Sequence, residues 1–105
     1  MKKTHIFFMI LCSGLMFGLL PVEASELEAG KAFFKKNRCM LCHSIGGSGG
    51  EIASDLSKVG SKRERAWFLK FFKNPKKWVP TAKMMPIKGS EKELSALADY
   101  LLAQK

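Results

Sequence analysis

The stretch of sequence that decides the fold is Cys39-Met40-Leu41-Cys42-His43. Two thiols three positions apart lie about one helical turn apart, so both can reach the same edge of a flat cofactor. The imidazole of the following residue then lies beneath that cofactor, where one ring nitrogen can bind a metal. This Cys-x-x-Cys-His pattern is typical of proteins that attach haem c through two thioether bonds.

The motif predicts that Cys39 and Cys42 hold one haem c covalently and that His43 is an axial ligand of its iron. Three other interpretations of the cysteines stay open: a zinc site, a thiol–disulfide redox pair and a plain disulfide. A zinc site needs four ligands, whereas the chain beyond residue 24 offers two Cys and one His. A thioredoxin-like pair follows a β-strand, and no segment here alternates like one. Haem c is therefore the preferred interpretation.

Residues 1–24 have the pattern of a secretory signal peptide. Two lysines precede an apolar run over residues 6–20, and small residues lead up to Ala24. We expect cleavage after Ala24, which leaves residues 25–105 as the mature domain and predicts the periplasm or another exported compartment. Cys12 lies in the apolar run and is expected to be dispensable. The alternative is an uncleaved anchor, and membrane association is expected only if this segment is retained.

Three helices are predicted in the mature domain, each preceded by a Ser-x-x-Glu capping box. They cover residues 26–37, 62–74 and 91–103, and Pro75 is expected to end the second. The Gly-rich residues 46–50 indicate a flexible loop. Because no segment alternates like a strand, the expected fold class is all-α. The capping serines are Ser25, Ser61 and Ser90.

The helices and the loop that follows the second helix carry more large aromatic side chains than so small a domain can bury alone. A chain of this size hides only about 60–65% of its unfolded surface. A bound haem would supply an apolar surface for these rings. The expected architecture is therefore three main helices with loops wrapped around one haem. The aromatic residues are Phe33, Phe34, Trp67, Phe68, Phe71, Phe72, Trp78 and Tyr100.

Residues 25–105 resemble a small monohaem class I c-type cytochrome. Besides the haem motif, the resemblance rests on Asn74-Pro75, on Lys83-Met84-Met85-Pro86 and on the run from Leu97 to Leu101. In this family the motif closes an N-terminal helix, and the last helix crosses the first. The resemblance implies a crossing between the predicted first and last helices that involves Gly30, Phe34, Leu97 and Tyr100.

The resemblance also implies the second axial ligand of the iron. Similar proteins place a Met directly before a Pro, and this position maps onto Met85. Pro86 disfavours helical backbone at Met85, and a soft thioether suits the iron of a high-potential couple. Met84 is the rival ligand.

The hydrogen-bond partner of the ligating histidine is less regular in this sequence. The family usually has a Pro after the haem motif whose carbonyl accepts a hydrogen bond from that histidine. Ser54 stands at the corresponding position here. A Ser carbonyl can still accept, although it lacks the rigidity of Pro. We therefore expect the Ser54 carbonyl to lie against His43.

The segment from Arg65 to Ser90 contains seven basic residues and no acidic one. Since it includes the proposed Met ligand, basic side chains are expected to flank that side of the haem. Export argues against nucleic acid as the partner. Attraction to an anionic membrane surface is a second interpretation. Steering towards a redox protein with an acidic docking surface is preferred. The seven residues are Arg65, Lys70, Lys73, Lys76, Lys77, Lys83 and Lys88.

These features together predict an exported electron carrier, not an enzyme, that shuttles single electrons between respiratory redox partners. We expect it to act as a monomer or as a subunit of a redox complex. One alternative is a haem-based sensor or peroxidase-like protein with a displaceable Met ligand. Another is a thiol–disulfide oxidoreductase without haem, which would keep Cys39 and Cys42 as free thiols.

Overall fold

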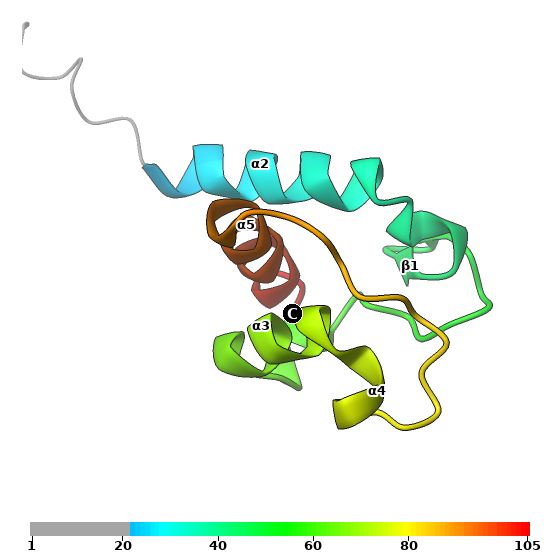
Figure 1. Ribbon diagram of the computed structural model, residues 1–105. Coiled ribbons are helices and arrows are strands. Elements are labelled where there is room, and N and C mark those ends of the chain that lie inside the picture. Colours follow the sequence, from blue (N-terminus) through cyan, green and yellow to red (C-terminus); the bar gives the residue numbers. More distant parts are fainter. Residues whose placement is uncertain (1–21) are drawn as a thin grey trace, which may run out of the picture.

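The computed structural model describes residues 22–105 (Figure 1). Helices dominate this part of the chain, which confirms the all-α fold class. The predicted leader lies outside the described residues except for its last three positions. No helix within residues 22–105 is long and apolar enough to cross a membrane. The elements are α2 (Val22–Lys36), η2 (Cys39–Leu41), β1 (Ser44–Ile45), β2 (Ser48–Gly49), η3 (Val59–Ser61), α3 (Arg65–Lys73), α4 (Pro75–Trp78) and α5 (Glu91–Leu102).

The crossing of α2 and α5 is the centre of the fold (Figure 1). Gly30 is buried at this crossing, because a Cβ atom there would meet the backbone oxygen of Ala96 and lie 2.7 Å from Tyr100 Cβ. The rings of Phe34 and Tyr100 pack with 5.5 Å between their centroids, and Leu97 lies in the same buried cluster. The predicted crossing of the first and last helices is confirmed.

The hydrophobic core joins α2, α3 and α5. In α3 the two buried residues, Phe68 and Phe72, are four positions apart and so lie on one face of the helix. Their neighbours Trp67 and Phe71 are only partly buried. The polypeptide therefore buries only half of the aromatic face of α3. The buried cluster consists of Phe33, Phe34, Phe68, Phe72, Leu94, Leu97, Ala98 and Leu101.

One of the three predicted capping boxes is present. Ser90 Oγ accepts from the Glu93 amide at 3.1 Å, and the Glu93 carboxylate accepts from the Ser90 amide at 3.0 Å. The other two predictions are wrong. Ser25 lies inside α2, which already begins at Val22, because Val22, Glu23 and Ala24 are all compatible with helix. Ser61 belongs to η3, which the bond from Gly60 N to Gln104 O ties to the end of the chain, so α3 starts later.

Pro75 ends one helix and begins another. The expected stop is present, since α3 ends at Lys73. The short α4, which the sequence did not predict, then starts with Pro75 in its first turn. Proline suits this position because its fixed φ is already helical and its missing N–H would have no partner there.

The Gly-rich stretch is ordered as a hairpin, which corrects the expectation of a flexible loop without strands. β1 and β2 pair antiparallel, with Ile45 opposite Ser48. Gly46 and Gly47 form the two-residue turn between them with φ values of 59° and 82°. Two successive left-handed residues match the twist of a hairpin, and glycine adopts them without strain.

Candidate haem-attachment site

The cysteine motif follows directly from the end of α2. The Asn37 amide and side chain both donate to Phe33 O, which closes the helix. Arg38 then adopts a left-handed conformation with φ 55°, and the chain turns into η2. The amides of Cys42 and His43 both donate to Cys39 O, at 3.3 and 2.9 Å. The motif is therefore wound into a single tight turn, as the spacing predicts.

The two thiols of the motif are unpaired. Cys42 is exposed, whereas Cys39 is partly buried, and burial raises the pKa of the Cys39 thiol. A catalytic redox cysteine needs the opposite shift, since the thiolate is the reactive form. Within residues 22–105, no three His, Cys, Asp or Glu side chains gather into a metal site. Within residues 22–105 the motif therefore offers two unpaired thiols and one imidazole, with no further metal ligands gathered beside them.

The imidazole of His43 is held by the predicted carbonyl. His43 Nδ1 lies 2.7 Å from Ser54 O. Because a carbonyl only accepts, Nδ1 carries the proton, and Nε2 of the neutral ring keeps its lone pair. This is the tautomer that a metal-ligating histidine needs. The expectation that Ser54 takes the place of the usual Pro is confirmed.

The segment with Ser54 is fastened to the motif along its length. Residues 53–57 run beside residues 42–46, and hydrogen bonds join the two segments from end to end. The bonds run from Ala53 N to Cys42 O (2.8 Å), from His43 Nδ1 to Ser54 O (2.7 Å), from Leu56 N to Ser44 O (2.8 Å) and from Gly46 N to Ser57 Oγ (2.8 Å).

Two glycines let the chain return closely onto the motif. A Cβ atom on Gly49 would meet His43 O, and one on Gly50 would meet Leu41 O. Gly49 also has φ 120°, which side chains rarely tolerate. The Gly50 amide donates to Met40 O at 2.8 Å. Larger residues at these positions would push the hairpin away from the motif and disturb the turn that carries His43.

Apolar side chains are exposed on the segments around the motif. Apolar side chains that stay in water cost free energy, so a cofactor that covers them would stabilise the fold. Figure 1 shows the hairpin, α4 and the loop after α4 on the same side of the molecule. Two free thiols, an oriented imidazole and this uncovered apolar surface suit a haem. The exposed residues are Leu41 (65%), Ile52 (83%) and Met85 (77%).

The two candidate methionines lie on one anchored loop. Ala82 N donates to Val79 O at 2.9 Å, which forms a turn at the start of the loop, and Ile87 N donates to Phe72 O at 2.8 Å, which anchors its far end to α3. Between these anchors Met84 is half-buried and Met85 is exposed. Neither methionine is bonded to the motif in the described residues.

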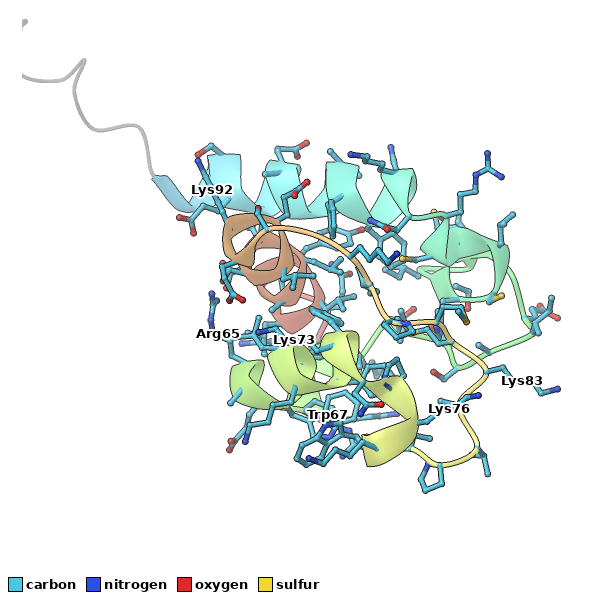
Figure 2. The ribbon with its side chains drawn as sticks, viewed as in Figure 1. Arg65, Trp67, Lys73, Lys76, Lys83 and Lys92 are labelled. Carbon is cyan, nitrogen blue, oxygen red and sulfur yellow. The ribbon has the colours of Figure 1, made fainter. Side chains whose placement is uncertain are left out.

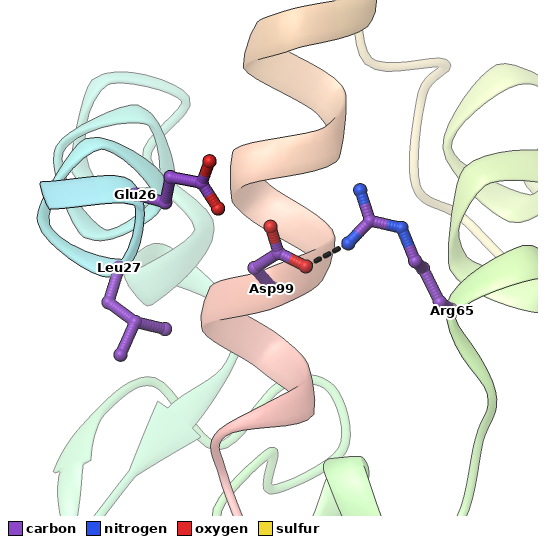
Figure 3. A pocket seen from close by; sticks show the side chains of 4 residues that line it. All are labelled: Glu26, Leu27, Arg65 and Asp99. Atoms are coloured by element: carbon purple, nitrogen blue, oxygen red, sulfur yellow. Dashed lines mark hydrogen bonds and ion pairs between the residues drawn. The ribbon is translucent and has the colours of Figure 1, made fainter. Parts of the chain in front are cut away.

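Ion pairs and ring stacks that the sequence does not predict surround α3. Arg65 pairs with Asp99 of α5, and both line a surface pocket with Glu26 and Leu27 (Figure 3). This pocket lies at the start of α2, whereas the motif follows its end, so it is not the haem site. A local sequence pattern cannot predict such ion pairs, because they join positions far apart in the chain.

The partly buried aromatic residues of α3 form a stack of their own. The Trp67 and Phe71 rings are nearly parallel with 4.7 Å between centroids. The Arg63 guanidinium lies over the Trp67 ring, with its Cζ 4.2 Å from the ring centroid. Arg63 and Trp67 therefore stabilise each other by a cation–π contact.

A helical fold with a tight Cys-x-x-Cys-His turn and an oriented imidazole defines a c-type cytochrome domain. The family model "Cytochrome c" matches residues 27–105. The match covers most of the chain, and the protein therefore belongs to the cytochrome c family. Proteins of this family bind haem c covalently, are typically electron carriers and are generally exported. A comparison with curated proteins gave no match.

Proposed function

We propose that this protein is an exported electron carrier that shuttles single electrons between respiratory redox partners in the periplasm. His43 and Met85 are the axial ligands of its one haem c, and Cys39 and Cys42 hold the ring. The observation that carries the proposal is the bond from His43 Nδ1 to Ser54 O, which leaves Nε2 for iron. The haem supplies a one-electron couple between ferrous and ferric iron.

The polypeptide has four tasks in this function. The thioethers keep the cofactor in place, and the Ser54 carbonyl keeps the imidazole of His43 in one orientation. Apolar side chains around the motif exclude water from the ring. The loop between Val79 and Ile87 brings a thioether to the second axial position. With both axial positions filled, substrates have no open coordination site, which suits electron transfer.

The visible spectrum of the purified mature protein tests the proposal most directly. We expect a low-spin haem c spectrum in both oxidation states and reversible one-electron reduction. A high-spin ferric spectrum, or strong binding of small ligands, would instead favour the sensor or peroxidase-like alternative. A colourless folded protein with two titratable thiols would favour the thiol–disulfide oxidoreductase.

Replacing Met85 by leucine is expected to remove one axial ligand and leave the covalent haem in place. Ferric iron then becomes high-spin, and the reduction potential falls because the soft thioether no longer favours the ferrous state. Leucine has nearly the same volume, so packing changes little. Absorption spectra and a redox titration measure both effects.

Met84→Leu is the matched control for this experiment and is expected to stay low-spin. Pro86 supports Met85 as the ligand, because it favours extended backbone at that residue. Met84 is half-buried, whereas Met85 is exposed, and this difference also supports Met85 as the ligand. If Met84→Leu alone becomes high-spin, then Met84 is the ligand.

The docking surface of the proposed carrier is formed by basic residues of α3, α4 and the following loop. Arg65 and Lys73 are neutralised by ion pairs with Asp99 and Glu91. Figure 2 shows Lys76 and Lys83 on the side of α4, away from Arg65. Five basic residues of the segment from Arg65 to Ser90 form no ion pair within residues 22–105, and we call them the lysine surface: Lys70, Lys76, Lys77, Lys83 and Lys88.

Trp78 lies next to two members of the lysine surface, Lys70 and Lys77. It is 39% exposed, and the Lys70 and Lys77 ammonium groups lie 5.5 and 5.8 Å from its ring centroid. Tryptophan residues often carry most of the binding energy of a protein interface. A redox partner with acidic residues around an apolar spot would match this surface in charge and in shape.

Reversing charges on the lysine surface is expected to change electron-transfer rates according to the charge of the reagent. The double variant Lys76→Glu/Lys83→Glu should react about two- to tenfold more slowly with the anion hexacyanoferrate(III) at low salt. It should react faster with a cationic cobalt(III) complex. Stopped-flow rates at increasing ionic strength measure both effects.

Lys31→Glu together with Lys35→Glu on the exposed side of α2 is the matched control for the charge reversal. It changes the net charge equally, so a small and equal effect of both double variants would mean that no local steering exists. We expect the difference between them to vanish as salt screens the charges.

A further inference from the structure

Ser57 and Asp55 form a compact hydrogen-bonded unit next to the carbonyl that orients His43. Ser57 Oγ donates to Asp55 Oδ1 at 2.6 Å, and Ser57 N donates to the same oxygen at 2.9 Å. Ser57 Oγ in turn accepts from the Gly46 amide at 2.8 Å. The unit therefore connects the loop of residues 53–57 to the turn of the hairpin.

The position of this unit in the chain gives it a role beyond the loop itself. Asp55 directly follows Ser54, so fixing its carboxylate limits rotation of the peptide group that contains Ser54 O. Ser54 lacks the ring that fixes φ in proline, so its backbone torsions depend on the bonds around it. The flanking bonds from Ala53 N to Cys42 O and from Leu56 N to Ser44 O hold the segment but leave this peptide group between them.

The carboxylate is well suited to act as a permanent acceptor. The two hydrogen bonds from Ser57 hold the pKa of Asp55 below its usual range, with Lys62 adding a smaller effect in the same direction. Asp55 therefore stays ionised at neutral pH. Its oxygen offers strong, charge-assisted bonds to the hydroxyl and the amide of Ser57.

We propose that Asp55 and Ser57 are positioning residues that clamp the Ser54 carbonyl against His43 and thereby tune the reduction potential of the iron. The inference rests on the proposed axial ligation by His43. A firm bond from Nδ1–H to a carbonyl makes the imidazole a better electron donor. A better donor stabilises ferric iron. Loosening the clamp should therefore shift the couple towards the reduced state.

Three single variants test the clamp on the haem-loaded protein. Asp55→Ala removes the acceptor and one negative charge, and Ser57→Ala removes the hydroxyl without changing charge. Glu51→Ala is the matched control, because this exposed carboxylate of the same loop has no hydrogen-bond partner among the described residues. Redox titration measures the potential of each variant. Proton exchange at His43 Nδ1, followed by NMR in the ferrous state, reports the orienting bond directly.

We expect Ser57→Ala to favour reduction about three- to tenfold in equilibrium constant over the unmodified protein. Asp55→Ala should favour reduction by a similar factor when it is compared with Glu51→Ala, which loses the same charge. Exchange of the Nδ1 proton should accelerate about tenfold or more in both clamp variants and stay unchanged in Glu51→Ala.

Two outcomes would overturn the clamp. The first is that the reduction potentials of the clamp variants equal those of their references. The second is that exchange of the His43 Nδ1 proton is unchanged in them. Either result would show that Ser54 is held by its other neighbours. Failure of Asp55→Ala to fold leaves Ser57→Ala to decide the matter. If the unmodified protein lacks a low-spin haem, the proposed function fails first, and that result is visible before any variant is made.

Discussion

Replacing Cys39 and Cys42 together by alanine is expected to give a colourless chain that does not fold stably. Without thioether bonds the haem is not retained, and the apolar side chains around the motif stay in water. A domain of this size has too small a core to compensate. Absorbance and circular dichroism of protein purified from cells that mature c-type cytochromes measure both losses.

Cys12→Ala is the control for the cysteine experiment. Because Cys12 lies in the predicted leader, its replacement should leave colour and fold unchanged. A double variant of the motif that is colourless yet folds as stably as the parent would contradict the premise that haem completes the interior. Loss of colour in Cys12→Ala would contradict the predicted leader.

Replacing Gly30 by alanine is expected to cost about 2 kcal/mol or more of the free energy of unfolding. An added Cβ would meet the backbone oxygen of Ala96, which cannot move aside without bending α5. At an exposed helix position the same change stabilises by about 1 kcal/mol, because alanine is the better helix former. The sign of the effect is therefore diagnostic. Denaturant titration of the haem-loaded protein measures it.

Ala29→Gly provides the reference for helix propensity on the same helix. Ala29 is exposed, so the change should cost about 1 kcal/mol without any steric contribution. If Gly30→Ala turned out neutral or stabilising, α2 and α5 would not approach as closely as the structure shows.

The parts of the fold that could be predicted from sequence are those that depend on local sequence patterns or on the cysteine motif. The spacing of the cysteines and the apolar period of α5 are local patterns, and the structure contains the tight turn and the helix that they predict. The Ser54 carbonyl could also be predicted, because resemblance placed it opposite His43. The axial role of Met85 stays a prediction, since two neighbouring methionines share the same loop.

Other elements depend on contacts that a local pattern does not contain. The Ser-x-x-Glu pattern at Ser61 failed because the backbone of η3 bonds to the end of the chain, which delays the start of α3. The hairpin was missed because its strands are two residues long, too short for any alternation. The ion pair between Arg65 and Asp99 joins α3 to α5 across 34 positions of sequence.

The ion pairs of α3 also have a consequence for how the whole molecule moves in an electric field. By pairing Arg65 and Lys73 with carboxylates, they leave the positive charge of the segment from Arg65 to Ser90 on Lys70 and on the lysines of α4 and the following loop. Carboxylates outside these two ion pairs lie at the beginnings of α2 and α5: Glu26, Glu28 and Glu93. The protein therefore carries a permanent dipole moment along its length. A negatively charged surface would rotate the protein during approach, so that the loop with Met84 and Met85 makes the first contact.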